Sequence, residues 1–96
     1  MKFISTRGNE RVTGAEAIAH GIASDGGLFV PETFPAVTRE ELEGMLSMSY
    51  AERAAVVLYK YLDEYDFGEL KAACEKAYSQ FDEGDAAPLV KIDSSL

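Results

Sequence analysis

The sequence of 96 residues is long enough for one domain with one core, and its 47% hydrophobic and 27% charged residues are ordinary for a globular protein. Seventeen acidic residues against nine basic ones give a formal net charge of −8, which repels nucleic acid and anionic lipid. The N-terminal residues lack the apolar region of a signal peptide, and no apolar run approaches membrane-spanning length. We therefore expect a cytoplasmic protein that binds neither nucleic acid nor membranes.

Residues 3–5 predict a short strand, and the polar loop that follows contains Gly8 and Asn9. Thr13 and Glu16 have the spacing of a capping box, in which the hydroxyl accepts from a free helix N–H and the carboxylate reaches back. A helix is therefore expected to begin after Thr13. Gly21 is a candidate stop for this helix. The apolar residues of the helix form one stripe at helical spacing: Ala15, Ile18, Ala19 and Ile22.

Paired glycines mark the next turn. Residues 24–27, Ser-Asp-Gly-Gly, favour a turn because glycine accepts the positive φ angles that other residues avoid. Residues 28–30 predict a second strand, and Pro31 ends it because proline has no N–H to donate to a strand ladder.

Two further capping boxes begin at Thr38 and Ser49, and they predict helices near 39–47 and 50–63. The second helix is apolar almost all the way round between residues 54 and 62. A helix of this kind is normally buried. It is therefore either the central helix of the domain or a helix with one face that awaits a partner.

Asp66 predicts the start of the last helix, in which the single cysteine, Cys74, is expected to be a small core residue. The apolar stripe of this helix comprises Leu70, Ala73, Cys74, Ala77, Tyr78 and Phe81. A polar turn at 82–87 precedes residues 88–92, which predict a third strand. We expect an α+β domain, mostly helical, with about four helices and a small sheet of about three short strands.

Few residues in this sequence suit catalysis. One histidine and one cysteine cannot build a usual zinc site without carboxylates, so no metal is expected. His20 is expected on the solvated side of its helix, and Lys91 is expected to be an exposed charge on an edge strand. Two polar segments remain as candidates for a site near substrate: Ser5, Thr6 and Arg7, and the turn of Asp25, Gly26 and Gly27. Turn chemistry alone accounts for either one, but a guanidinium at a strand end also suits a phosphate or carboxylate.

The same two segments resemble the opening of threonine synthase. In that family a strand ends in Ser-Thr-Arg-Gly, here residues 5–8, and a helix then leads to Asp-Gly-Gly-Leu-(Tyr or Phe)-Val-Pro, here residues 25–31. Residues 34–35, 49–52 and 87–92 also fit the family. The resemblance covers essentially the whole chain, and it implies that residues 1–96 are the N-terminal domain of such an enzyme.

The resemblance implies a parent enzyme that converts O-phospho-L-homoserine to L-threonine and phosphate with pyridoxal phosphate, a carbon–oxygen lyase of threonine biosynthesis. In the family, the cofactor lysine lies in a Phe-Lys-Asp segment that follows His-Gly-Pro-Thr. Neither segment occurs here, and Lys91 does not match that lysine. We therefore expect a fragment that is inactive alone, contains no catalytic or cofactor-binding residue, and acts together with the catalytic domain of its own chain.

Two roles within the parent enzyme are also implied. Part of the surface at residues 54–62 is expected to dock against the catalytic domain. Residues 5–7 and the turn at 25–27 either line the mouth of the active site or only fix the domain to the core of the enzyme. The alternative function is a free-standing acidic interaction module that uses the apolar helix as its partner face. A small independent enzyme has only the number of carboxylates in its favour.

Overall fold

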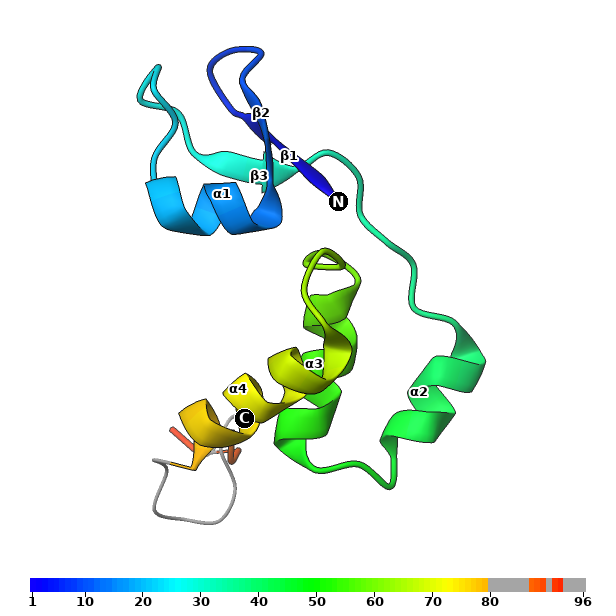
Figure 1. Ribbon diagram of the computed structural model, residues 1–96. Coiled ribbons are helices and arrows are strands. Elements are labelled where there is room, and N and C mark those ends of the chain that lie inside the picture. The colour runs from blue at the N-terminus through cyan, green and yellow to red at the C-terminus, as the bar shows by residue number, and fades with distance from the viewer. Residues whose placement is uncertain (80–86, 90, 93–96) are drawn as a thin grey trace.

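The computed structural model describes residues 1–79, 87–89 and 91–92. The sheet and the first helix form one part of the molecule and the later helices form a second, with residues 32–38 crossing between them (Figure 1). In chain order the elements are β1 (Lys2–Ser5), β2 (Arg11–Thr13), α1 (Gly14–His20), β3 (Phe29–Pro31), α2 (Arg39–Met45), α3 (Tyr50–Tyr59) and α4 (Phe67–Tyr78). The predicted α+β class, with four helices and a small sheet, is confirmed for the described residues.

The sheet is antiparallel, with β1 in the centre and the order β2-β1-β3. Phe3 pairs with Val12 on one side and with Pro31 on the other. The strand predicted at 28–30 is thus shifted by one residue, and Leu28 instead forms an isolated bridge with Ile22. β1 is hydrogen-bonded to both neighbouring strands. The end of β1 therefore determines the position of the loop that begins with Thr6.

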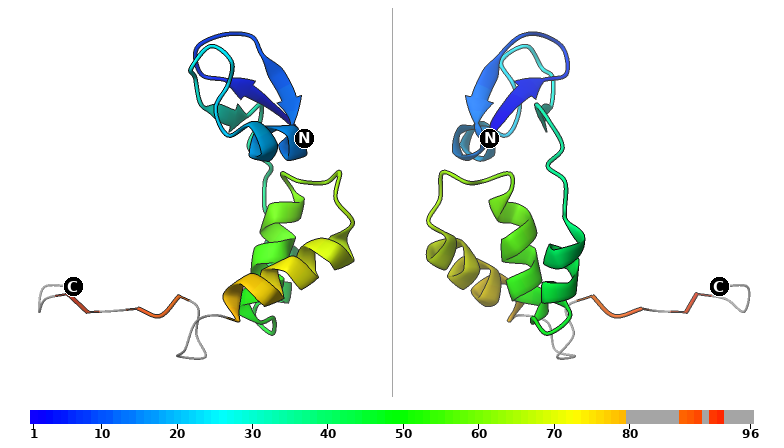
Figure 2. Two further views of the ribbon diagram at one scale, coloured as in Figure 1. Left: turned by 60° about the vertical axis from the view of Figure 1, so that its left-hand side comes forward. Right: turned by 90° about the vertical axis from the view of Figure 1, so that its right-hand side faces the viewer.

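One predicted strand is wrong. Residues 87–89 and 91–92 have no strand conformation, and the third strand is Arg11–Thr13, which the sequence predicted as loop. Leu89 and Ile92 are fully and largely exposed, and Figure 2 shows the described residues of this segment lying away from both parts. β2 closes a hairpin with β1 instead, and its Val12 is 6% exposed, which supplies the burial that the C-terminal segment does not have.

The predicted helix starts are confirmed. Capping boxes at Thr13, Thr38 and Ser49 begin α1, α2 and α3, and the Asp66 carboxylate accepts from the Glu69 N–H at the start of α4. α1 ends at His20 and is capped by the predicted stop, Gly21, which has a φ of 76°. The C-terminal ends of α2 and α3 differ from the prediction. α2 ends at Met45 and α3 ends at Tyr59, each before its predicted end. Among the described residues no helix is of the length and apolarity needed to span a bilayer.

α3 and α4 form the main core of the helical part. Ala51 and Ala55 of α3 pack against Cys74 of α4, and all three are buried. The rings of Tyr50 and Tyr78 meet edge to face, with their centroids 4.8 Å apart. The predicted core position of Cys74 is confirmed, and burial raises the pKa of its thiol.

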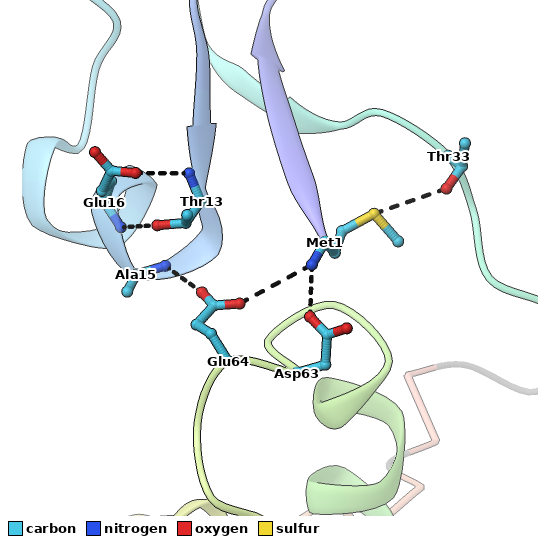
Figure 3. A network of polar contacts seen from close by, with 7 residues as sticks. All are labelled: Met1, Thr13, Ala15, Glu16, Thr33, Asp63 and Glu64. Atoms are coloured by element: carbon cyan, nitrogen blue, oxygen red, sulfur yellow. Dashed lines mark hydrogen bonds and ion pairs between the residues drawn. The ribbon is translucent and has the colours of Figure 1, made fainter.

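The loop between α3 and α4 joins the helical part to the sheet part (Figure 3). The Met1 amine lies 2.5 Å from the Asp63 carboxylate and 4.0 Å from that of Glu64. The other Glu64 oxygen accepts from the Ala15 N–H at 2.7 Å, in the first turn of α1. These polar contacts set the orientation of the sheet part on the helices.

Burial within the described chain is incomplete. None of its large side chains is fully buried. On α3, Val57 and Leu58 are 40% and 37% exposed, and Ile18 of the predicted α1 stripe is 63% exposed. Within the described chain α3 is therefore buried on one face only, so of the two alternatives predicted for this helix the fully enclosed central helix is excluded. The exposed face borders an apolar hollow of about 380 Å³ lined by Tyr50, Arg53, Ala54, Val57, Leu58 and Tyr78.

Candidate functional site

The structure brings all six predicted site residues together at one end of the sheet. Ser5 ends β1, and the chain from Thr6 to Gly8 runs beside the turn that precedes β3. The Thr6 N–H donates to the Leu28 carbonyl at 2.9 Å, and the Leu28 N–H donates to Thr6 Oγ1 at 3.0 Å. This reciprocal pair holds the two segments side by side.

The Asp25 carboxylate is the centre of the cluster. Its Oδ1 accepts from the Ser5 hydroxyl at 2.7 Å and from the Gly27 N–H at 2.9 Å. Ser5 Oγ in turn accepts from the Arg7 N–H at 3.1 Å, and Ser5 is 5% exposed. The network links β1, the Arg7 loop and the turn through one buried hydroxyl, so these residues fix loop geometry.

The turn depends on its two glycines. Gly26 has a φ of 83°, a conformation that residues with a Cβ adopt only with strain. A Cβ on Gly27 would overlap Ser5 Oγ and would lie 2.9 Å from the Arg7 backbone nitrogen. Only glycine therefore allows the turn to approach β1 this closely.

The hydrogen bonds from Ser5 and Gly27 lower the pKa of the Asp25 carboxyl from its ordinary 3.8. Partial burial raises this pKa and the positive charge of Arg7 lowers it, and the net direction is downward. Because the folded pKa is lower than the unfolded one, the charged carboxylate stabilises the fold above the unfolded pKa. That contribution is lost as the pH falls through the folded pKa.

We expect the unfolding free energy of the wild type to fall more steeply than that of Asp25→Asn as the pH drops from about 5 to about 2. The amide keeps an acceptor oxygen for Ser5 and Gly27 but does not titrate, and the other acids are common to both proteins. Urea unfolding followed by circular dichroism at several pH values measures this difference. If the difference in unfolding free energy between the wild type and Asp25→Asn is the same at every pH, the expectation is contradicted.

Arg7 is exposed, and its guanidinium lies beside Gly26, where an added Cβ would be 2.8 Å from Nη1. His20 and Lys91 are both exposed, as predicted, although Lys91 does not lie in a strand.

Two residues that support the cluster were not among the predicted site residues. Glu10 accepts from both the N–H and the hydroxyl of Ser24, at 3.0 and 2.5 Å. Gly8 leaves room for Asp25, because a Cβ there would overlap Oδ2. Glu10 is a single acidic residue in a loop, and no local sequence pattern indicates that Ser24 is its partner. Gly8 did stand in the Ser-Thr-Arg-Gly motif, which was the available signal.

Comparison with known proteins finds threonine synthases along the whole chain. The enzyme of Methylobacillus glycogenes is 30% identical over 106 residues, and that of Pseudomonas aeruginosa is 33% identical over 97 residues. These matches cover 100% and 99% of this chain but 22% and 21% of the relatives. The chain thus spans about a fifth of their length.

Solved structures agree. A crystal structure of pyridoxal-phosphate-bound threonine synthase from Brucella melitensis matches with a TM-score of 0.86 and 32% identity, over 98% of this chain and 21% of its own. Threonine synthase from Escherichia coli matches with a TM-score of 0.82 and 27% identity, over the same shares. The family model described as the threonine synthase N terminus matches residues 2–78, and the chain therefore belongs to the threonine synthase N-terminal family.

Proposed function

We propose that residues 1–96 are the N-terminal domain of a pyridoxal-phosphate-dependent threonine synthase and are inactive alone. The parent protein would convert O-phospho-L-homoserine to L-threonine and phosphate. The observation that carries this proposal is the match of the chain, over nearly all its length, to about a fifth of a pyridoxal-phosphate-bound threonine synthase. The cofactor would supply the electron sink for the reaction.

The described residues do not fit that cofactor themselves. Pyridoxal phosphate is held in such enzymes through a lysine. Lys60 pairs with Glu41 at 2.6 Å and Lys71 lies 3.9 Å from a Glu75 oxygen. The other three lysines, Lys2, Lys76 and Lys91, are exposed, and the polar cluster contains no lysine. The cofactor would therefore be held by another part of the parent chain, and no chemical step is assigned to this domain.

The polar cluster would form an ordered loop at the mouth of the enzyme's active site. It comprises Ser5, Thr6, Arg7 and the turn at 25–27. Its support is geometric: a closed hydrogen-bond network holds the loop in one conformation while the Arg7 side chain is exposed. A loop that is already ordered loses little entropy when it closes over a substrate.

The first test is to read the source gene past the codon for Leu96 and to assay the encoded protein. We expect the frame to continue into His-Gly-Pro-Thr and Phe-Lys-Asp segments. The full-length protein with pyridoxal phosphate should form threonine, and the 96-residue chain should not. Threonine formation by the 96-residue chain, or none by the full-length protein, would contradict the proposal.

The apolar hollow beside α3 and α4 would be the docking face for the catalytic part of the same chain. Val57 and Leu58 are more than one third exposed there, although side chains of this kind are usually buried in a completed protein. We expect the 96-residue chain to bind an apolar dye or to self-associate, and the full-length protein to do neither. A strictly monomeric fragment without dye binding would refute this docking role.

The same exposed face is the observation that favours the second candidate function, an acidic interaction module. A stop codon directly after Leu96 would favour that function.

A further inference from the structure

Arg7 differs from the other arginines in its partners. Arg11 pairs with Glu32 at 2.8 Å, and Arg39 pairs with Glu43 at 3.1 Å. Arg53 donates from Nε to the Met45 carbonyl at 2.7 Å. The Arg7 guanidinium makes neither a hydrogen bond nor an ion pair with the described part of the chain. This is notable in a chain that carries seventeen acidic residues.

The neighbouring carboxylate of Asp25 forms no ion pair with Arg7 in the described structure. Asp25 Oδ1 already accepts from Ser5 and Gly27, and Oδ2 lies toward Gly8. The positive charge of Arg7 contributes to the lowered pKa of Asp25, but without a contact of ion-pair length.

Gly26 also leaves the guanidinium uncovered. Its Nη1 lies beside Gly26, which has no side chain to cover the planar group or to accept its hydrogen bonds. The backbone N–H of Arg7 is bound to Ser5 Oγ, so the base of the side chain is fixed while its tip is free. A fixed base with an unused fork of donors is suited to bind an external oxyanion.

We propose that Arg7 binds an oxyanion of the substrate, its phosphate or its carboxylate, while Ser5, Asp25 and Gly27 only position the loop. This inference rests on the proposed function and deepens it, because it assigns the direct contact to one side chain of the cluster. Both groups present two oxygens to a planar fork, so the shared chemistry is a bidentate, charge-assisted hydrogen bond.

The test compares Arg7→Ala and Arg7→Lys with a matched control, Arg39→Ala, in the full-length protein with pyridoxal phosphate. Arg39 is exposed on α2, and among the described residues its guanidinium pairs only with Glu43 of the same helix. We expect Arg7→Ala to raise KM for O-phospho-L-homoserine about tenfold or more. Arg7→Lys should retain part of the affinity, because an ammonium keeps the charge and loses the fork. Arg39→Ala should leave KM unchanged, and none of the three should lower the thermal unfolding midpoint appreciably.

Inhibition by inorganic phosphate and by L-threonine separates the two sources of the oxyanion. If Arg7 binds the phosphate, only phosphate inhibition weakens in Arg7→Ala. If it binds the carboxylate, only threonine inhibition weakens. Unchanged KM and unchanged inhibition by both would overturn the inference.

Calorimetric titration with inorganic phosphate and with L-threonine keeps this result separate from that of the proposed function. If the wild type forms no threonine, the proposed function fails. The Arg7 inference is then judged on binding alone: weaker binding of either compound by Arg7→Ala supports it, and equal binding of both overturns it.

Discussion

Gly27→Ala is expected to destabilise the chain by about 2–3 kcal/mol, near the upper end for an overpacked site. The added Cβ would overlap Ser5 Oγ and would lie 2.9 Å from the Arg7 backbone nitrogen and 3.0 Å from Asp25 Oδ1. Ser5 is 5% exposed, so its hydroxyl cannot rotate into solvent without losing Asp25. The backbone nitrogen cannot rotate away at all, so the turn must separate from β1. Urea unfolding followed by circular dichroism measures the loss.

Gly44→Ala is the matched control for that experiment. Gly44 lies within α2, and a Cβ there would meet nothing within 4 Å. Alanine is the better helix former, so this variant should gain about 0.5–1 kcal/mol. If Gly27→Ala proves as stable as the wild type, the close approach of the turn to β1 is not a feature of the folded protein.

The helix starts could be predicted because capping is local chemistry. The Ser49 hydroxyl accepts from the Glu52 N–H at 3.2 Å, and the Glu52 carboxylate accepts from the Ser49 N–H at 3.4 Å. Both partners lie within one turn, so their spacing in the sequence contains the needed information.

Features that depend on distant partners could not be predicted in the same way. β2 contains a single apolar residue, Val12, and becomes a strand only because β1 offers it an edge. α3 ends at Tyr59 although apolar residues continue to Leu62. The loop that follows contains Asp63 and Glu64. Their carboxylates accept hydrogen bonds from the Met1 amine and the Ala15 N–H, which are far away in the sequence.

The site was predicted as a set of residues but not as an arrangement. The sequence and the family resemblance named the two segments, and the structure places them side by side. The division within the cluster appears only in the geometry: Asp25 binds Ser5 and Gly27, whereas the Arg7 guanidinium has no partner among the described residues. Whether any of these residues touches substrate stays a prediction, because contact with a ligand is not encoded in turn chemistry.

The packing of α3 on α4 gives the second large effect. Ala55 is 0% exposed, and it packs with Ala51 against Cys74 where the two helices meet. Leucine at position 55 would need volume that a close-packed interface does not have, so α3 and α4 would have to move apart. We expect Ala55→Leu to cost about 2–3 kcal/mol of unfolding free energy.

Ala72→Leu is the control, because Ala72 lies on α4 and is exposed. The same added volume there reaches solvent, and the change in stability should stay within about 0.5 kcal/mol. A second measurement identifies the cause of the loss. Cys74 is 6% exposed, so its thiol should react slowly with a thiol reagent in the wild type and in Ala72→Leu. In Ala55→Leu it should react faster, because separating the helices exposes the sulfur. Equal stability and equal thiol reactivity in all three proteins would show that α3 and α4 do not form the tight interface on which the helical part depends.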